Sequence, residues 1–329
     1  MIAEMSFAEA SLLALRQEME RDPRVWAVGE DLGPEGGLAG QYRGLQKMFG
    51  AERICDTPIS ESMIMAAGVG AAIAGTRPVV ELRFADFAVC AADEIINQAA
   101  KIRYMFDGQA RVPVVIRQGI GMRGGTAAQH SQSLEALWVH IPGLIVMAPA
   151  TPADNFGMLK AAIRCDDPVI YLEHKALWGI KGPVDPEAPP IAIGKAERVR
   201  AGRDVTIVTW SGMRAECANA ADALLERGVS VDLIDLRSLW PWDQDMVMDS
   251  VRRTGRLIVA HEAVRAGGFG AEIVAEVSEQ LWSTLRAPVR RLGAPRTPVP
   301  FSLPLEEACR VSVDMIVRAA LETVGGKAH

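Results

Sequence analysis

The chain has 329 residues, which is long enough for two domains of ordinary size. Its composition is 49% apolar and 23% charged, as in most globular proteins, and its net charge of −6 argues against nucleic acid or an anionic membrane as the main partner. The five cysteines form no CxxC pair, so we expect neither a disulfide framework nor a zinc site, and a reduced, cytoplasmic compartment.

The N-terminal residues are acidic and amphipathic and lack a basic segment followed by an apolar core. We therefore expect no signal peptide. The longest apolar stretch, residues 63–74, contains two glycines and is too short to cross a bilayer, so no membrane span is expected.

Strand-like and helix-like segments alternate through the first half of the chain. A helix over 6–21 is expected to begin at Ser6, because Glu9 follows at the spacing of a capping box. The pattern then predicts these strands and helices in order: strand 25–31, a short helix after a glycine-rich loop, strand 53–57, helix 60–75, strand 77–84, a long helix near 86–106, strand 112–118, strand 144–149, a helix after Thr151 and strand 168–174. Several of these strands are continuous apolar runs, which is typical of parallel strands buried on both faces.

The stretch 178–203 is rich in proline and glycine and predicts an interdomain linker with a short strand near 191–199. The alternation then resumes on a smaller scale, with strands over 204–210, 229–238, 256–262 and 288–293 and helices over 213–227, 243–254, 268–285 and 304–324. The sequence thus predicts an α/β protein of two three-layer domains, residues 1–177 and 204–329, joined by the linker.

Directly after the strand 112–118, the glycines 119, 121 and 124 match the spacing of a dinucleotide-binding fingerprint. The fingerprint also requires a helix opening at the third glycine and an acidic residue at the end of the next strand, and that strand ends without one. We favour a flexible loop at the rim of an active site.

Glu61 lies where a strand passes into an apolar helix, at the carboxyl edge of a parallel sheet, where ligands bind in such folds. A carboxyl with little water around it favours its protonated form, which suits proton exchange with a heterocyclic nitrogen. The ordinary alternative is an acid that complements the helix dipole in the first turn.

Two further residues have both a functional and a structural interpretation. His130 follows the glycine-rich loop, where an imidazole can reach a ligand and exchange protons, or can simply cap or fill the core. Phe87 starts the predicted long helix, where an aromatic ring usually belongs to the core but can also stack on a flat ligand ring.

Nine segments together resemble one family. They occur in order between residues 56 and 272, and the resemblance as a whole covers about residues 5–325: DTPISES, RPVVELRFADF, NQAAKIRYMF, AAQHSQ, HIPGL, APATPAD, DPVIYLEHK, HEAVRAGGFGAE and, between the first two, an Ala/Gly-rich helix. The chain resembles the β subunit of the thiamine-diphosphate-dependent first component of pyruvate, branched-chain 2-oxoacid and acetoin dehydrogenase complexes. The resemblance implies a pyrimidine-binding thiamine-diphosphate domain followed by a transketolase C-terminal-like domain.

The resemblance also assigns roles to the three candidate residues. Glu61 would hydrogen-bond N1′ of the cofactor's aminopyrimidine, Phe87 would stack on that ring, and His130 would lie near the substrate and the incoming lipoyl group. These assignments come from the family and not from the residue types alone.

A diphosphate-binding GDG…N motif is absent from the sequence, so this chain is expected to hold no metal itself. The resemblance implies that an α subunit supplies the Mg²⁺ site in an α2β2 assembly, and that the C-terminal domain contacts a lipoyl acyltransferase core. In some relatives a structural K⁺ lies at the segment that matches 162–168. The expected substrate is a 2-oxoacid of the pyruvate type or acetoin. The alternatives are a branched-chain 2-oxoacid dehydrogenase β subunit and a stand-alone thiamine-diphosphate synthase or transketolase-like enzyme.

Overall fold

The computed structural model describes residues 1–325, which divide into two compact units. Unit 1 comprises residues 1–120, 137–193 and 239–241. Unit 2 comprises residues 121–136, 194–238 and 242 onward. The units do not follow the order of the chain, because the segment 121–136 packs with residues that come much later. We call this segment the histidine loop, since it carries His130.

Unit 1 is built on a seven-stranded sheet in the order β12-β6-β7-β5-β4-β2-β3. The pairs among β2 to β7 are all parallel. The strands are β2 (Val25–Gly29), β3 (Ile54–Asp56), β4 (Arg77–Phe84), β5 (Val115–Ile120), β6 (Ile145–Met147), β7 (Val169–His174) and β12 (Ser238–Trp240). Every residue of β5 and β7 is buried, as the continuous apolar runs predicted.

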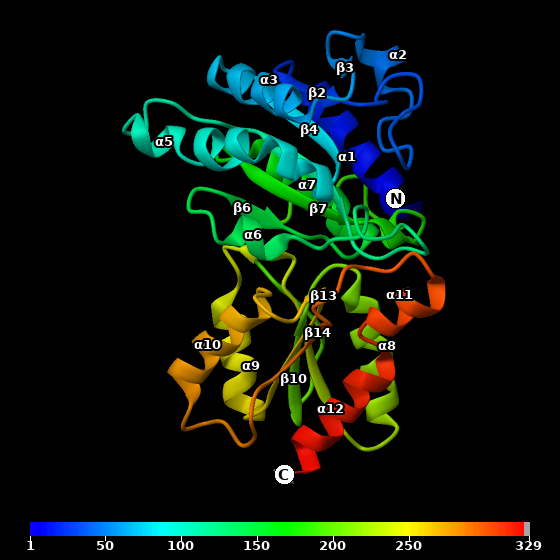
Figure 1. Ribbon diagram of the computed structural model, residues 1–329, viewed down its shortest axis with the longest axis vertical. Coiled ribbons are helices and arrows are strands. Elements are labelled where there is room, and N and C mark those ends of the chain that lie inside the picture. The colour runs from blue at the N-terminus through cyan, green and yellow to red at the C-terminus, as the bar shows by residue number, and fades with distance from the viewer. Residues whose placement is uncertain (326–329) are drawn as a thin grey trace. The chain divides into compact units, whose positions relative to one another are not determined.

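Helices cover both faces of this sheet (Figure 1). On one face α1 (Phe7–Arg21) packs against α7 (Pro152–Arg164), and on the other α3 (Glu61–Ile73) packs on β4. The capping box predicted at Ser6 and Glu9 is present at the start of α1. The remaining elements of this part of the chain are β1 (Ala3–Ser6), α2 (Leu45–Phe49), α6 (Glu135–Val139), η3 (Lys175–Leu177) and β8 (Lys181–Val184), with β1 and β8 pairing antiparallel.

The prediction of one long regular helix near 86–106 is wrong, although the segment is helical. The segment is helical in four pieces, namely α4 (Ala85–Ala88), the 3₁₀ turn η1 (Val89–Ala91), the π turn η2 (Glu94–Ala99) and α5 (Ile102–Met105). In the π turn the amide of Ala100 donates to the carbonyl of Ile95, which accommodates an extra residue. Hydrophobic periodicity cannot distinguish such a bulge from a continuous helix.

Unit 2 has a five-stranded sheet in the order β14-β13-β10-β11-β9, parallel except for β9. In Figure 1, α8 and α12 lie on one face of this sheet and α9 and α10 on the other. The elements are β9 (Glu197–Arg200), β10 (Val205–Thr209), α8 (Met213–Leu225), β11 (Val231–Asp235), α9 (Gln244–Thr254), β13 (Leu257–Val264), α10 (Gly270–Leu281), β14 (Arg290–Ala294), α11 (Leu303–Cys309) and α12 (Val313–Gly325). Both units are therefore three-layer α/β structures, which confirms the predicted fold class.

Within the described residues, every helix is too short or too polar to cross a bilayer. The five cysteines are all free thiols.

Candidate active site

Glu61 is the first residue of α3 and follows β3 at the carboxyl edge of the sheet in unit 1. The connection between them is anchored, because the Asp56 carboxylate accepts the amides of Leu32 (2.8 Å) and Gly33 (3.3 Å) in the loop after β2. Glu61 is half-buried. Its place at a helix N-terminus suits a dipole-complementing acid as well as a ligand-binding one, so position alone leaves both interpretations open.

Phe87 lies in α4, directly after β4, and its half-buried ring meets the ring of Phe84 edge-on at 5.6 Å. The hydroxyl of Ser62, the neighbour of Glu61, donates to the carbonyl of Cys90 at 2.6 Å. This hydrogen bond ties the first turn of α3 to the segment that follows Phe87. The structure thus joins the elements that carry a carboxylate and an aromatic ring at one edge of one unit.

An acid that the sequence analysis passed over lies at the same edge. Glu30 follows β2, is only 9% exposed, and burial together with the charge of Glu61 raises the pKa of its carboxyl. The guanidinium of Arg83 lies 3.9 Å from Glu30 and also pairs with Asp31. Glu30 could have been identified from the sequence, because it directly follows a continuous apolar strand.

A buried ionic cluster lies on the strands beneath this edge. The fully buried Arg117 on β5 donates from Nε to Glu173 (2.9 Å) and lies 3.8 Å from Glu81 on β4. Glu81 accepts the Tyr42 hydroxyl at 3.0 Å and the backbone amide of Arg83 at 3.1 Å. Arg83 has a φ of +57°, so the Glu81 carboxylate holds a left-handed residue near the end of β4, directly before Phe84.

His130 lies in unit 2, within the histidine loop, and is half-buried. The loop closes on itself, because the hydroxyl of Thr126 lies 2.7 Å from that of Ser131 and the amide of Gly121 donates to the carbonyl of Gln132. A loop, and no helix, follows the glycines 119, 121 and 124, as the sequence analysis favoured over a dinucleotide-binding fingerprint. The sequence analysis expected this loop to be flexible, whereas carboxylates of unit 2 anchor its backbone.

A second histidine, His261 on β13, is fully buried. Its Nδ1 lies 3.1 Å from the Ala263 carbonyl and its ring stacks on Trp210 at 5.3 Å. Burial lowers the pKa of His261 to about 4, so the ring is neutral at pH 7. Cβ atoms added at Gly268 and Gly270 would lie 2.7 and 2.8 Å from the ring, which is therefore a packing element.

The segment matched to a potassium site in some relatives is occupied by guanidinium groups. The carbonyls of Ile163 and Cys165 accept from Arg77 at 3.0 and 2.8 Å, and Asp166 pairs with Arg77 and Arg111. A second cation beside these oxygens would be repelled by the arginines. The segment as described does not fit a bound K⁺.

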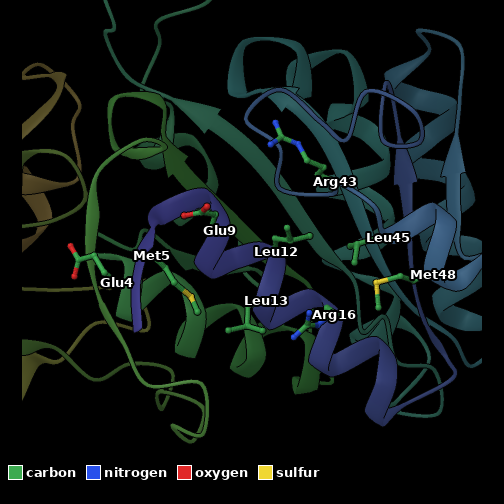
Figure 2. Close-up of a pocket in the computed structure, with 9 residues that line it drawn as sticks. All are labelled: Glu4, Met5, Glu9, Leu12, Leu13, Arg16, Arg43, Leu45 and Met48. Atoms are coloured by element: carbon green, nitrogen blue, oxygen red, sulfur yellow. The ribbon is translucent and has the colours of Figure 1, made fainter. Parts of the chain in front are cut away.

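A separate open hollow of about 300 Å³ lies beside α1 and α2. Figure 2 shows its leucine and methionine side chains, with the charged side chains placed around them. Its lining residues are Glu4, Met5, Glu9, Leu12, Leu13, Arg16, Arg43, Leu45 and Met48. None of the candidate residues lines this hollow, so it is distinct from the edge that carries Glu61.

Two family models together match most of the chain. The transketolase pyrimidine-binding domain matches residues 3–180 and the transketolase C-terminal domain matches residues 194–316. A solved structure described as a split-gene transketolase, an inactive β4 tetramer, has the same fold, with a TM-score of 0.81 at 24% identity over 98% of this chain and 100% of that one.

The chain matches β subunits of acetoin and 2-oxoacid enzymes over nearly their full length. The chain is 45% identical to the acetoin:2,6-dichlorophenolindophenol oxidoreductase subunit beta of Cupriavidus necator, covering 96% of both chains. It is 43% identical to the pyruvate dehydrogenase E1 component subunit beta-1 of Arabidopsis thaliana mitochondria, over 96% of this chain and 88% of that one. It is 39% identical to the 2-oxoisovalerate dehydrogenase subunit beta of Bacillus subtilis, over 97% and 98%.

Proposed function

We propose a function on the basis of family membership. The chain belongs to the family of acetoin and 2-oxoacid dehydrogenase β subunits, as the resemblance of its motifs indicated. It is the β subunit of a thiamine-diphosphate-dependent dehydrogenase of the pyruvate or acetoin type. With an α subunit it decarboxylates a 2-oxoacid, or cleaves acetoin, and transfers the acyl group to lipoamide. The transketolase-type domains and the similar β subunits support this function.

The observation that carries the proposal is the joined edge of unit 1. The Ser62–Cys90 hydrogen bond holds the turn that presents Glu61 against the segment that presents Phe87. An acid and an aromatic ring are the groups that a flat, nitrogen-containing ring needs for a hydrogen bond and for stacking. The residues of this chain therefore fit the pyrimidine end of thiamine diphosphate.

In this proposal Glu61 hydrogen-bonds the pyrimidine nitrogen N1′ and exchanges a proton with it, while Phe87 orients the ring. When bound, thiamine diphosphate would supply the nucleophilic carbon that the reaction needs. Burial and the charge of Glu61 raise the pKa of Glu30, so a second carboxyl that holds its proton more readily lies at this edge and supports proton exchange here.

His130 is proposed to contact the substrate and the incoming lipoyl group as a proton donor or hydrogen-bond partner. The self-closed histidine loop supports this role, because a fixed backbone presents an imidazole in a defined position. The role itself comes from the motif AAQHSQ that carries the residue.

The diphosphate and its Mg²⁺ are assigned mainly to the α subunit, since this sequence lacks a GDG…N motif. We expect an α2β2 heterotetramer in which the cofactor is shared between an α and a β chain. The C-terminal domain is proposed to contact a lipoyl acyltransferase core. Exposed apolar side chains of unit 2 are what such a surface requires, among them Trp282, Phe301, Leu303 and Leu305.

The test is reconstitution with the α chain, thiamine diphosphate and Mg²⁺, followed by dye reduction with pyruvate, acetoin and branched-chain 2-oxoacids. We expect Glu61→Ala to lower kcat by at least a hundredfold while the α–β assembly remains intact, because the cofactor loses its proton partner. Glu52→Ala is the matched control, since Glu52 is an exposed acid of the same unit. Activity like that of the unmodified protein in the Glu61 variant would rule out the assigned role.

The substrates also separate the named alternatives. Selective turnover of branched-chain 2-oxoacids would assign the chain to the 2-oxoisovalerate type, whose Bacillus subtilis β subunit is 39% identical to it. Tight binding of thiamine diphosphate by the purified β chain alone, measured by calorimetry, would instead indicate a stand-alone synthase or transketolase-like enzyme.

A further inference from the structure

We propose that Glu306, on α11, is a positioning residue that fixes the conformation of the histidine loop and thereby the place of His130. Its catalytic consequence rests on the proposed function, whereas its effect on the loop does not. The motif that contains His130 does not include this acid.

The carboxylate of Glu306 binds two consecutive amides of the loop. Gly124 donates to Oε1 at 2.7 Å and Gly125 donates to Oε2 at 2.8 Å, and the side chain is 4% exposed. Both glycines have left-handed backbones, with φ of +59° and +80°, which turn successive N–H groups to the same side. Hydrogen bonds to a charged acceptor are the stronger kind, so this contact can hold a loop that is rich in glycine.

A second carboxylate anchors the same part of the loop. The amide of Met122 donates to Oε1 of Glu262, on β13, at 2.6 Å. The Met122 side chain is buried with Ala294 and Cys309. Three of the four amides from Met122 to Gly125 therefore bind acids of unit 2, and the entrance to the loop is set by β13 and α11.

The constraint passes from these amides to His130 through Thr126. Thr126 directly follows Gly125, and its hydroxyl contacts the hydroxyl of Ser131 at 2.7 Å and the carbonyl of His130 at 3.4 Å. The amide of His130 also lies 3.5 Å from the carbonyl of Ala127. A loop this tightly closed moves as a piece, so releasing Gly124 and Gly125 displaces the imidazole.

Glu307 provides a matched control. It is the next residue on the same helix, its side chain is 68% exposed, and it pairs only loosely with Arg310 at 3.4 Å. Glu306→Gln and Glu307→Gln thus remove the same charge from adjacent positions. In the first variant an amide cannot accept from both glycines through equivalent oxygens, because one end of it is a donor.

The experiment uses the assembled α–β holoenzyme. We expect Glu306→Gln to lower kcat about tenfold to a hundredfold, since small misplacement of a substrate-contacting group has effects of this size. The apparent affinity for thiamine diphosphate should stay within about twofold, because Glu61 and Phe87 belong to unit 1. Glu307→Gln should match the unmodified enzyme in both measurements.

Limited trypsin digestion reports on the loop without requiring activity. Arg123 is exposed and precedes Gly124, so a loosened loop should be cleaved there several-fold faster in Glu306→Gln than in Glu307→Gln. If the unmodified complex were inactive with every substrate, the proposed function would fail, and this digestion would still decide the positioning claim. Equal digestion of the two variants would overturn it. So would a parallel loss of kcat and cofactor affinity, which indicates general unfolding.

Discussion

Glu81 is an acid whose surroundings oppose its charge. It is 4% exposed, and burial outweighs the attraction of Arg117 and raises the pKa of Glu81 to about 7. Nearby Glu173 adds repulsion, while hydrogen bonds from Tyr42 and the Arg83 amide act in the other direction. The folded protein therefore binds a proton at this carboxyl more tightly than the unfolded chain does.

The contribution of Glu81 to the free energy of unfolding falls as the pH rises. A folded pKa above the ordinary value of 4.5 contributes stability that is fully present below pH 4.5 and is lost as the pH rises through about 7. The contribution amounts to about 3 kcal/mol for a shift of this size. Because Gln does not titrate, the free energy of unfolding of Glu81→Gln relative to the unmodified protein should rise between pH 5 and pH 7.5.

Urea unfolding at the two pH values measures this difference, and groups that titrate equally in both proteins cancel from it. A difference that does not change with pH would show that Glu81 is ionised throughout. The variant also keeps an oxygen that can accept from the Arg83 amide, so the left-handed conformation of Arg83 near the end of β4 should persist.

At the scale of elements, α3 owes its position to a glycine. A Cβ atom at Gly68 would lie 2.4 Å from Cγ2 of Val80 on β4, whereas a Cβ atom at Gly70, two residues later, would meet nothing within 4 Å. Only the first of these glycines allows the helix to approach the sheet closely. The helix begins at Glu61, so its seating also sets the position of the proposed proton partner.

These two glycines make a paired prediction. Gly68→Ala should lower the free energy of unfolding by about 1–3 kcal/mol through overpacking, and should lower kcat as α3 shifts. Gly70→Ala should instead raise stability by about 0.5–1 kcal/mol, because alanine is the better helix former. Urea unfolding and dye-reduction rates provide both measurements. A Gly68 variant as stable as the Gly70 variant would contradict the close contact.

The elements that sequence predicted well are those with strong local signals. The capping box at Ser6 and the buried strands β5 and β7 are each determined by a few neighbouring residues, so they can be predicted from a short stretch of sequence. The π turn η2 and the antiparallel pair β1–β8 cannot be predicted in this way, since a bulge and a distant pairing depend on tertiary contacts.

The candidate residues show the same division. Glu61, Phe87 and His130 lie in recognisable motifs, and their roles stay predictions until they are tested by mutation. Glu30 and Glu306 had no motif to mark them. Glu306 meets its partners across about 180 residues of chain, and the local pattern of a single sequence does not record such a distant contact.

For the whole molecule, the division into units predicts how fragments behave. A fragment of residues 194–329 lacks the histidine loop, so Glu262 and Glu306 lose the amides of Met122, Gly124 and Gly125. We expect it to unfold at a lower urea concentration than the same fragment with residues 121–136 fused ahead of residue 194 by a Gly/Ser linker. Charge-assisted hydrogen bonds of this kind contribute about 1.5–3 kcal/mol each. Equal midpoints would show that the loop does not stabilise unit 2.

The interleaved units also restrict how this chain can be recombined with its relatives. The boundaries between units fall after residues 120, 136, 193, 238 and 241, so a single crossover near the linker would bring one parent's histidine loop onto another parent's β13 and α11. Chimaeras that exchange residues 121–136 together with 194–329 keep each glycine amide with the acid it evolved beside. A library designed on such discontinuous blocks should retain more folded members than one cut once in the middle.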